Sequence, residues 1–192
     1  SEVQHVHYTV EDNKLVHQFV IWCDRPKDFG YPYTLSNHPR LGMSWYEALA
    51  YVRWLTVFLQ NSKLLPFNWT VHLPTEPEWE KAARGGIELS LRSRLRALTG
   101  TVWRLPTSGK TRQNKTPARL FPWGNQIDAN LLNYQETKIE TTNTVGIFPG
   151  GVSPYGVEEL SGNYWEWTSS LWGEDWYNCT FGYPYQVDNW RE

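Results

Sequence analysis

The chain has little cysteine and no long hydrophobic run. Its two cysteines, Cys23 and Cys179, are too few for a disulfide scaffold and lack zinc-site spacing. Whether they pair with each other is left open by the sequence. No apolar stretch approaches the roughly 18 residues that a membrane span needs, so we expect no membrane partner. No secretory signal pattern opens the chain, which favours the cytoplasm but leaves the compartment open.

Aromatic residues, in contrast, are abundant. The 192 residues include 12 tryptophans and 11 tyrosines, and the aromatic share of 16% is too high for a disordered chain. A chain of this length can form one domain with a real core.

Charge is unevenly distributed, although the formal net charge is only -2. The stretch from Leu89 to Leu120 holds eight Lys or Arg residues and no acid, whereas Phe121 to Glu192 holds ten acids and two bases. We interpret residues 87–120 as a solvated basic insertion, with an electrostatic partner site as the alternative. Nucleic acid is not an expected partner, because no base-reading or stacking module is evident.

Two Ser/Thr-x-x-Glu capping boxes predict two helices, one beginning at Ser44 and the other at Thr75. The first helix should run from about Trp45 to Gln60, where apolar residues recur at helical spacing. The second should run to Arg84, with Gly85 supplying a left-handed exit.

Other segments carry weaker signals. Strands are predicted over Val16–Cys23 and Thr70–Leu73, and a short helix over Ile87–Leu98. From Phe121 onward, turn residues alternate with Trp and Tyr, which predicts a loop-rich β region. Bound calcium commonly organises such regions, because it neutralises carboxylates and binds backbone carbonyls.

The most informative stretch is Gly162 to Trp167, in which two tryptophans flank Glu166. If both indoles are buried, this carboxylate must be paired or bind a metal, because an unpaired buried charge is costly. Trp123, Trp165 and Trp167 either pack in the core, which we favour, or line a ligand pocket.

Five ordered motifs resemble one family: His38–Tyr51, Leu73–Gly85, Phe121–Asn125, Val145–Val157 and Ser161–Trp167. The chain resembles the formylglycine-generating enzyme, or sulfatase-modifying factor, family from about Asn37 to Ser170. This resemblance implies an α+β fold of the C-type-lectin-like type, with two short helices on a small antiparallel sheet and many loops. It also implies a single domain over residues 1–192, incomplete at both ends.

The family contains copper-dependent oxidases, iron-dependent sulfoxide synthases and noncatalytic binding domains, including variable proteins of diversity-generating retroelements. The oxidases carry a cysteine pair after an R-G-G-S-W strand, which this chain lacks, and copper(I) favours such thiolates. An iron site would need clustered histidines, but those of this chain are scattered. We therefore expect neither copper nor iron. His5 and His7 could share one strand face, which we interpret as chance.

The family's calcium sites match this sequence better than its copper and iron sites do. By position, one site would use the side chains of Glu159 and Glu166 and the carbonyls of Gly162 and Tyr164. The alternative is that Glu166 accepts hydrogen bonds from backbone amides. A second family site would use Asn133 and the carbonyl of Tyr134. The family's carboxylate there falls near Thr137 in this chain, with Glu136 or Glu140 as possible substitutes.

A further aromatic group lies near the C-terminus, among Gly and Asn residues with no regular period. Exposed aromatics with adaptable polar neighbours are typical of binding surfaces, although core packing is the alternative. The residues are Trp172, Trp176, Tyr177, Tyr183 and Tyr185.

These patterns lead to one functional hypothesis and two alternatives. We predict a calcium-stabilised module that binds a protein or small-molecule ligand and is noncatalytic as given. The first alternative is a formylglycine-generating or iron-dependent oxidase whose catalytic C-terminal strand is absent from this chain. The second is a regulatory domain fused to other domains in a larger protein.

Overall fold

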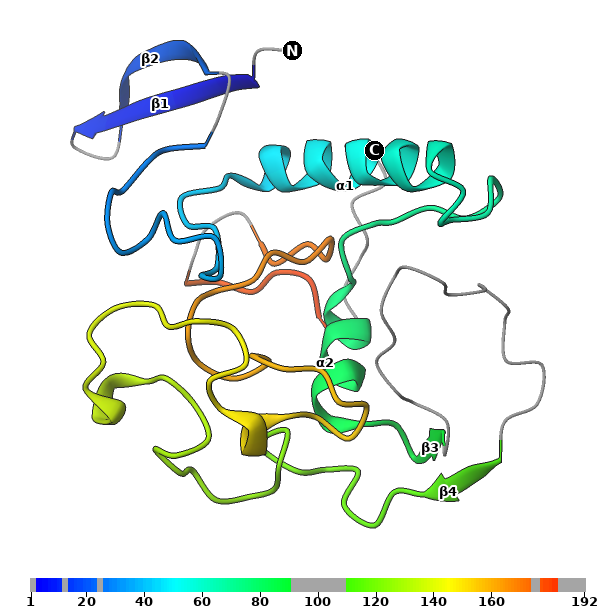
Figure 1. The fold of residues 1–192 in the computed structure, drawn as a ribbon. Helices are drawn as coiled ribbons and strands as arrows, with labels where there is room; N and C mark the ends of the chain where they lie inside the picture. The colour runs from blue at the N-terminus through cyan, green and yellow to red at the C-terminus, as the bar shows by residue number, and fades with distance from the viewer. Residues whose placement is uncertain (1–2, 12–13, 24–25, 91–109, 174–176, 183–192) are drawn as a thin grey trace.

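The computed structural model describes residues 3–11, 14–23, 26–90, 110–173 and 177–182, with backbone alone up to residue 23. Its elements follow the order β1 (Val3–Glu11), β2 (Lys14–Cys23), α1 (Trp45–Asn61), α2 (Glu76–Arg84), β3 (Glu88–Ser90) and β4 (Thr111–Gln113), then the 3-10 turns Gln135–Thr137 and Pro149–Gly151. Two helices and two small antiparallel sheets confirm the predicted α+β class (Figure 1).

The first sheet is a hairpin of β1 and β2. Its register pairs Val3 with Cys23 and Thr9 with His17, and then shifts by one residue next to the turn. The predicted strand from Val16 is therefore present and begins earlier, at Lys14.

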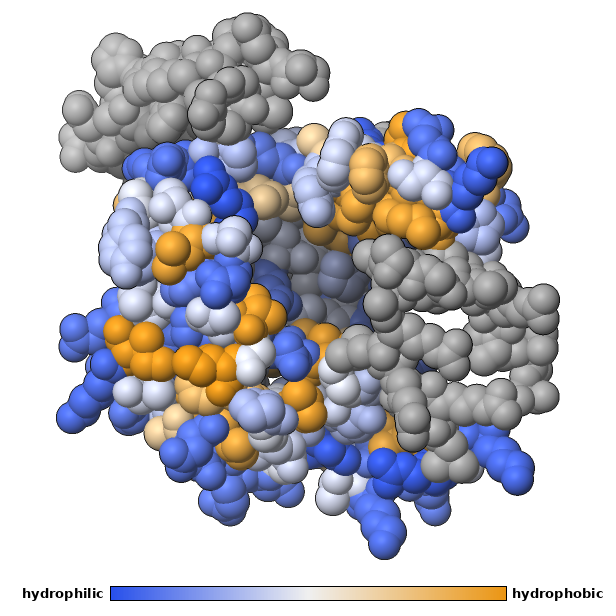
Figure 2. All heavy atoms as spheres, in the orientation of Figure 1, coloured by the Kyte–Doolittle hydropathy of each residue, from blue (hydrophilic) through white to orange (hydrophobic). Residues whose placement is uncertain are grey.

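Helix α1 begins at its predicted capping box. The backbone N–H of Ser44 donates to Glu47 Oε2 at 2.7 Å, and the N–H of Glu47 donates to Ser44 Oγ at 3.3 Å. These two bonds satisfy amides that have no partner within the helix. Helix α1 also presents an exposed row of aromatic rings, Tyr51, Trp54 and Phe58, with adjacent ring centres 5.7 and 5.2 Å apart. Apolar residues cover part of α1 on the visible surface (Figure 2).

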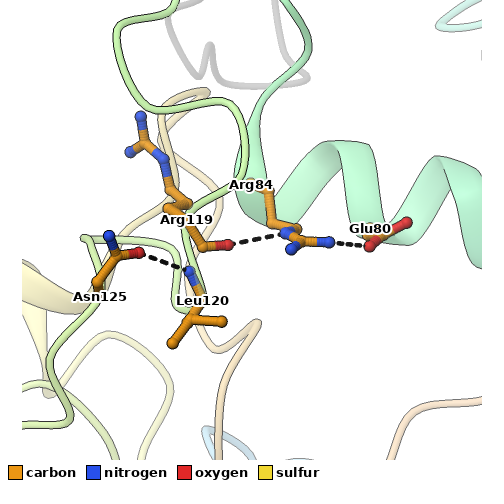
Figure 3. A network of polar contacts seen from close by, with 5 residues as sticks. All are labelled: Glu80, Arg84, Arg119, Leu120 and Asn125. Atoms are coloured by element: carbon orange, nitrogen blue, oxygen red, sulfur yellow. Dashed lines mark hydrogen bonds and ion pairs between the residues drawn. The ribbon is translucent and has the colours of Figure 1, made fainter.

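Helix α2 also has its predicted cap, and it ends at Arg84 as predicted. Gly85 follows with a φ of 79°, so the glycine exit is correct, but its ψ of 157° differs from a left-handed helical turn. The end of α2 is tied to the following loops (Figure 3): Arg84 pairs with Glu80, and its Nε donates to the carbonyl of Arg119 at 2.8 Å.

Two predicted elements are wrong in the described residues. Thr70–Leu73 is not a strand; instead the N–H of Val71 donates to Thr56 Oγ1 of α1 at 2.9 Å. A side chain of α1 therefore accepts a hydrogen bond that a neighbouring strand was expected to accept. Ile87–Leu98 is not a helix, because β3 forms within it and pairs with β4. This pairing brings residues 88–90 and 111–113 of the basic insertion side by side, while the remainder of that predicted helix lies outside the described residues.

The region after residue 120 is less regular than predicted. In residues 121–173 and 177–182 the structure forms no strand longer than a single bridge residue, such as the bridge between Phe121 and Gly124. Leu132 and Leu160 are buried in this region. Within the described part of the chain, neither helix has the length and apolarity needed to cross a membrane.

Candidate functional site

A cavity of about 430 Å³ lies between the start of α1 and the loop of residues 158–167. In Figure 1 this loop is the orange stretch beneath α1, and Figure 2 shows a hollow on this face of the molecule. The lining residues are Pro39, Arg40, Met43, Ala48, Leu73, Val145, Glu158, Glu159, Asn163, Tyr164, Trp165, Glu166 and Trp167.

Hydrogen bonds hold the loop against the start of both helices. The indole Nε1 of Trp167 donates to the carbonyl of Met43 at 2.8 Å. In the other direction, Nε1 of Trp45 donates to the carbonyl of Thr168 at 3.0 Å. The backbone N–H of Glu76, at the start of α2, donates to Ser170 Oγ at 2.9 Å. The two capping boxes thus place the helix starts that support the cavity.

Glu159 is held on both carboxylate oxygens. The N–H of Gly146 donates to Oε1 at 3.1 Å, and Nδ2 of Asn163 donates to Oε2 at 3.0 Å. Glu159 and Asn163 both have positive φ values, 59° and 61°, which side-chain-bearing residues rarely adopt. Positive φ values raise the energy of the backbone, so the surrounding contacts must compensate for that energy to hold this carboxylate in place.

Glu166 is held by a side chain rather than by the backbone amides of the alternative. Its Oε2 accepts a hydrogen bond from the indole Nε1 of Trp79 in α2, not from a backbone amide. Burial raises the pKa of Glu166, the bond from Trp79 opposes this, and the charge of Glu159 raises the pKa further. Burial and the neighbouring negative charge both favour the neutral form of this carboxyl.

The flanking tryptophans are not buried, so the expectation of core packing was wrong for both. Trp165 is 83% exposed and Trp167 is 49% exposed. Trp123 is partly exposed, and its ring stacks on Phe121 at 5.3 Å. Trp165 and Trp167 line the cavity instead, which was the less favoured alternative.

Gly162 packs closely against the backbone of Asn133. A Cβ atom on it would lie 2.3 Å from the carbonyl oxygen of Asn133, and its φ is 79°. Its own carbonyl accepts a hydrogen bond from the N–H of Tyr164 at 2.8 Å. The structure therefore places Glu159, Tyr164 and Glu166 on one cavity, with Gly162 packed against the other predicted site.

Asn133, which is buried, and Tyr134, which is half-buried, belong to a hydrogen-bonded turn. Nδ2 of Asn133 donates to the carbonyl of Thr141 at 2.8 Å, and its carbonyl accepts from the N–H of Asn163. Thr137 closes the turn by donating to the carbonyl of Leu132 at 2.8 Å.

Glu136 and Glu140 are exposed, although either had been a possible substitute ligand. Within the described ranges, no three acidic, histidine or cysteine side chains cluster as metal ligands.

One buried oxygen atom is relevant to cation binding at the first predicted site, that of Glu159 and Glu166. Asn143 is 5% exposed, and its Oδ1 has no hydrogen-bond partner. Its N–H donates to Asn163 Oδ1 at 3.0 Å, and Asn163 in turn donates to Glu159. Carboxylate, carbonyl and amide oxygens are the ligands that calcium prefers, so the donor set of this network fits that ion.

The C-terminal aromatic residues are described only in part. Trp172 is 52% exposed and Tyr177 is 91% exposed. The carbonyl of Trp172 accepts from the N–H groups of Thr180 and Phe181, at 3.0 and 3.3 Å. Trp176, Tyr183 and Tyr185 lie outside the described residues.

Cys179, next to these aromatics, is a free and exposed thiol.

Sequence reasoning missed the opposite wall of the cavity. Arg40, Met43 and Leu73 line it, and they come from loops that precede α1 and α2. They lie within the motifs His38–Tyr51 and Leu73–Gly85, but those motifs do not indicate a cavity, because its lining depends on long-range hydrogen bonds such as that from Trp167 to Met43.

Residues 15–186 match the family described as the sulfatase-modifying factor enzyme 1-like domain. The chain is 32% identical over 148 residues to the formylglycine-generating enzyme of Mus musculus, covering 71% of this chain and 28% of that protein. It is 26% identical to serine/threonine-protein kinase pkn1 of Chlamydia pneumoniae, covering 78% of this chain and 16% of the kinase.

A third relative is the inactive C-alpha-formylglycine-generating enzyme 2 of Bos taurus, at 29% identity over 69% of this chain and 33% of that protein. The matches thus span a third or less of each relative's length. No solved structure matches significantly. Because the family match covers most of the sequence, this chain belongs to the sulfatase-modifying factor family.

Proposed function

We propose that this chain is a noncatalytic recognition module with a C-type-lectin-like fold, stabilised by calcium. One observation carries the proposal: the carboxylates of Glu159 and Glu166 line one cavity, and the unpaired Oδ1 of Asn143 is buried in the network that holds Glu159. Two neighbouring carboxylates and a buried acceptor are stabilised by a hard divalent cation.

Calcium would be held by the side chains of Glu159 and Glu166 together with the carbonyls of Gly162 and Tyr164. Its charge would oppose the burial and the repulsion by Glu159 that raise the pKa of Glu166. A second ion at Asn133 and Tyr134 belongs to the same proposal.

The ligand would be a protein or a small molecule that binds exposed aromatic side chains. Trp172 and Tyr177 support this proposal through their exposure, since aromatic anchors dominate binding surfaces. Trp176, Tyr183 and Tyr185 are proposed members of the same surface. Similarity to the relative named a kinase, which is much longer than this chain, supports the proposal that the domain is fused to other domains.

The noncatalytic part of the proposal rests on cysteine chemistry. The resemblance to the family's oxidases implies a thiol pair, whereas Cys179 is a single exposed thiol. The relative named an inactive formylglycine-generating enzyme 2 is consistent with loss of catalysis in this family. Similarity to the relative named a formylglycine-generating enzyme supports the oxidase as the rival function.

The test is metal analysis of purified protein combined with thermal unfolding. We expect bound calcium, and a melting temperature that falls by several degrees when a chelator removes it. At a free calcium concentration 100 times the Kd, the ion would stabilise the native state by about 2.7 kcal/mol.

Two variants localise the ion. Glu166→Gln removes a proposed ligand charge and should abolish most of the calcium-dependent stabilisation. Asp128→Asn is the matched control, because Asp128 is exposed and, in the described structure, its carboxylate accepts hydrogen bonds only from Asn130. Copper or iron bound in place of calcium would contradict the proposal and favour the oxidase. A melting temperature that does not change when chelator is added would also contradict the proposal.

A further inference from the structure

Helix α1 is apolar on its exposed side as well as on its buried side. Its buried positions include Ala48, Val52 and Leu59. A surface helix normally carries charged and polar residues on its outer side, whereas a helix that is apolar all round is normally buried. The exposed apolar positions, which we call the α1 face, are Tyr46, Ala50, Tyr51, Trp54, Val57 and Phe58.

Three rings of the α1 face form a continuous row. The ring of Trp54 lies 5.7 Å from that of Tyr51 and stacks on that of Phe58 at 5.2 Å, with 18° between the two planes. Their spacing of three and four residues is that of the seam along which two helices pack side by side. The mutual contacts restrict the rings, which reduces the entropy that they would lose on binding.

The α1 face carries almost no charge. Among the exposed positions of α1, Arg53 alone is charged, and the helical period places it at the edge of the exposed arc. The one acid of the helix, Glu47, is buried in the capping box. A strongly charged partner would lose hydration here without gaining opposite charges, so an equally apolar surface is the better match.

The exposed area suits a second copy of this chain. The five large side chains of the α1 face are 49–58% exposed. Covering them in two copies would remove roughly 1,000 Å² from water, which is about the minimum for a specific interface. We propose that this chain forms a symmetric dimer in which the α1 faces of two copies pack against each other.

A two-fold axis, the commonest symmetry of dimers, would bring the same patch from each copy together. Antiparallel helices that cross at Trp54 would set Ala50 of one copy opposite Phe58 of the other. The same crossing would set Tyr51 opposite Val57. Both pairings match a larger side chain with a smaller one, as close packing of two helices requires.

The proposed dimer is independent of the recognition function and of calcium, because no residue of the α1 face lines the cavity or belongs to the proposed calcium ligands. The domain could therefore bind its ligand as a monomer, or dimerise without binding calcium. Each proposal can fail without the other.

The experiment is analytical ultracentrifugation of the purified chain, in calcium and in chelator. For an interface of this small size we expect a Kd on the order of 10 µM, so the mass should rise from one copy to two between about 1 and about 200 µM. The melting temperature should rise over the same concentration range, because dimerisation stabilises the native state.

Variants locate the contact. Trp54→Glu removes the central ring and places a charge in the interface, so it should weaken dimerisation by at least about 30-fold. Phe58→Ala, a milder change, should weaken it by about fivefold. Ile127→Glu is the matched control, since it adds the same charge at a 52% exposed apolar residue outside α1, and it should leave the Kd unchanged. Circular dichroism checks that each variant is folded.

The inference is overturned if the wild-type chain remains a monomer up to about 200 µM, a result that needs no variant. It is also overturned if Trp54→Glu and Phe58→Ala both dimerise as the wild type does. A monomer that instead binds phosphatidylcholine vesicles would assign the α1 face to a lipid surface, against this proposal. Dimerisation without any stabilisation by calcium would contradict the calcium proposal alone.

Discussion

The helical region, residues 44–90, and the loop region, residues 121–173, fix their backbones by different means. In the helical region, the hydrogen bonds of α1 and α2 join near neighbours, and each helix start is capped by a residue three positions away. In the loop region, hydrogen bonds join distant turns, as when the N–H of Asn143 reaches Asn163 and that of Gly146 reaches Glu159.

This difference determines how each region fails. A local cap can be lost while the rest of its helix remains, because the other helical bonds do not depend on it. The loop region has few independent supports, and several of its residues adopt positive φ values that its long-range bonds must maintain. Damage to one close contact in the loops should therefore cost more than loss of a helix cap.

Gly162→Ala should have the largest effect. The new Cβ would meet the carbonyl of Asn133 at 2.3 Å, and alanine is strained at a φ of 79°. We expect a loss of about 3 kcal/mol or more in the free energy of unfolding, measured by urea denaturation.

Gly124→Ala is the control for this substitution, because its Cβ would meet no atom within 4 Å and its φ is not in the positive range. It should change stability by less than about 1 kcal/mol. Equal losses in the two variants would show that the contact between Gly162 and Asn133 does not support the loop region.

Thr75→Ala should have a smaller effect, about 1 kcal/mol, because it removes one cap of α2. Hydrogen bonds from the backbone N–H and hydroxyl of Thr75 lower the pKa of Glu78, so this variant should move that pKa back towards its ordinary value. Urea denaturation and a carboxylate NMR titration measure the two effects.

The loss in Thr75→Ala should be the same with calcium and with chelator, since α2 does not contain the proposed ligands. Thr70→Ala, at an exposed position without regular structure, is its control. A calcium-dependent loss would remove the distinction between the two regions.

The helices could be predicted because their signals are local. The spacing from Ser44 to Glu47 and from Thr75 to Glu78 is sufficient to place both starts, and the structure has both boxes. The predicted strand at Thr70–Leu73 failed because a hydroxyl of α1, from Thr56, bonds that backbone instead. No feature of residues 70–73 themselves indicates this partner.

The candidate site could be predicted only in part for the same reason. The family resemblance implied a common site for Glu159, Tyr164 and Glu166, and all three line one cavity. Their metal role remains a prediction. The exposure of Trp165 and the bond from Trp79 to Glu166 were not predictable, because both depend on how α2 packs beside the loop.

The pH dependence of stability tests whether the loop region carries an uncompensated charge, and it has the smallest expected effect. The folded protein raises the pKa of Glu166 above 4.5, so the folded state binds this proton more tightly than the unfolded state does. In chelator, this group's contribution is therefore most favourable at low pH and is lost as pH rises from about 4.5 through the folded pKa. Glu166→Gln cannot titrate, so wild-type stability should fall relative to this variant as pH rises over that window. Urea denaturation at several pH values measures this difference, and calcium should reverse its sign because the ion favours the ionised carboxylate. A pH-independent difference would mean that Glu166 is fully compensated without a cation, and that the loop region needs no ion to balance its charge.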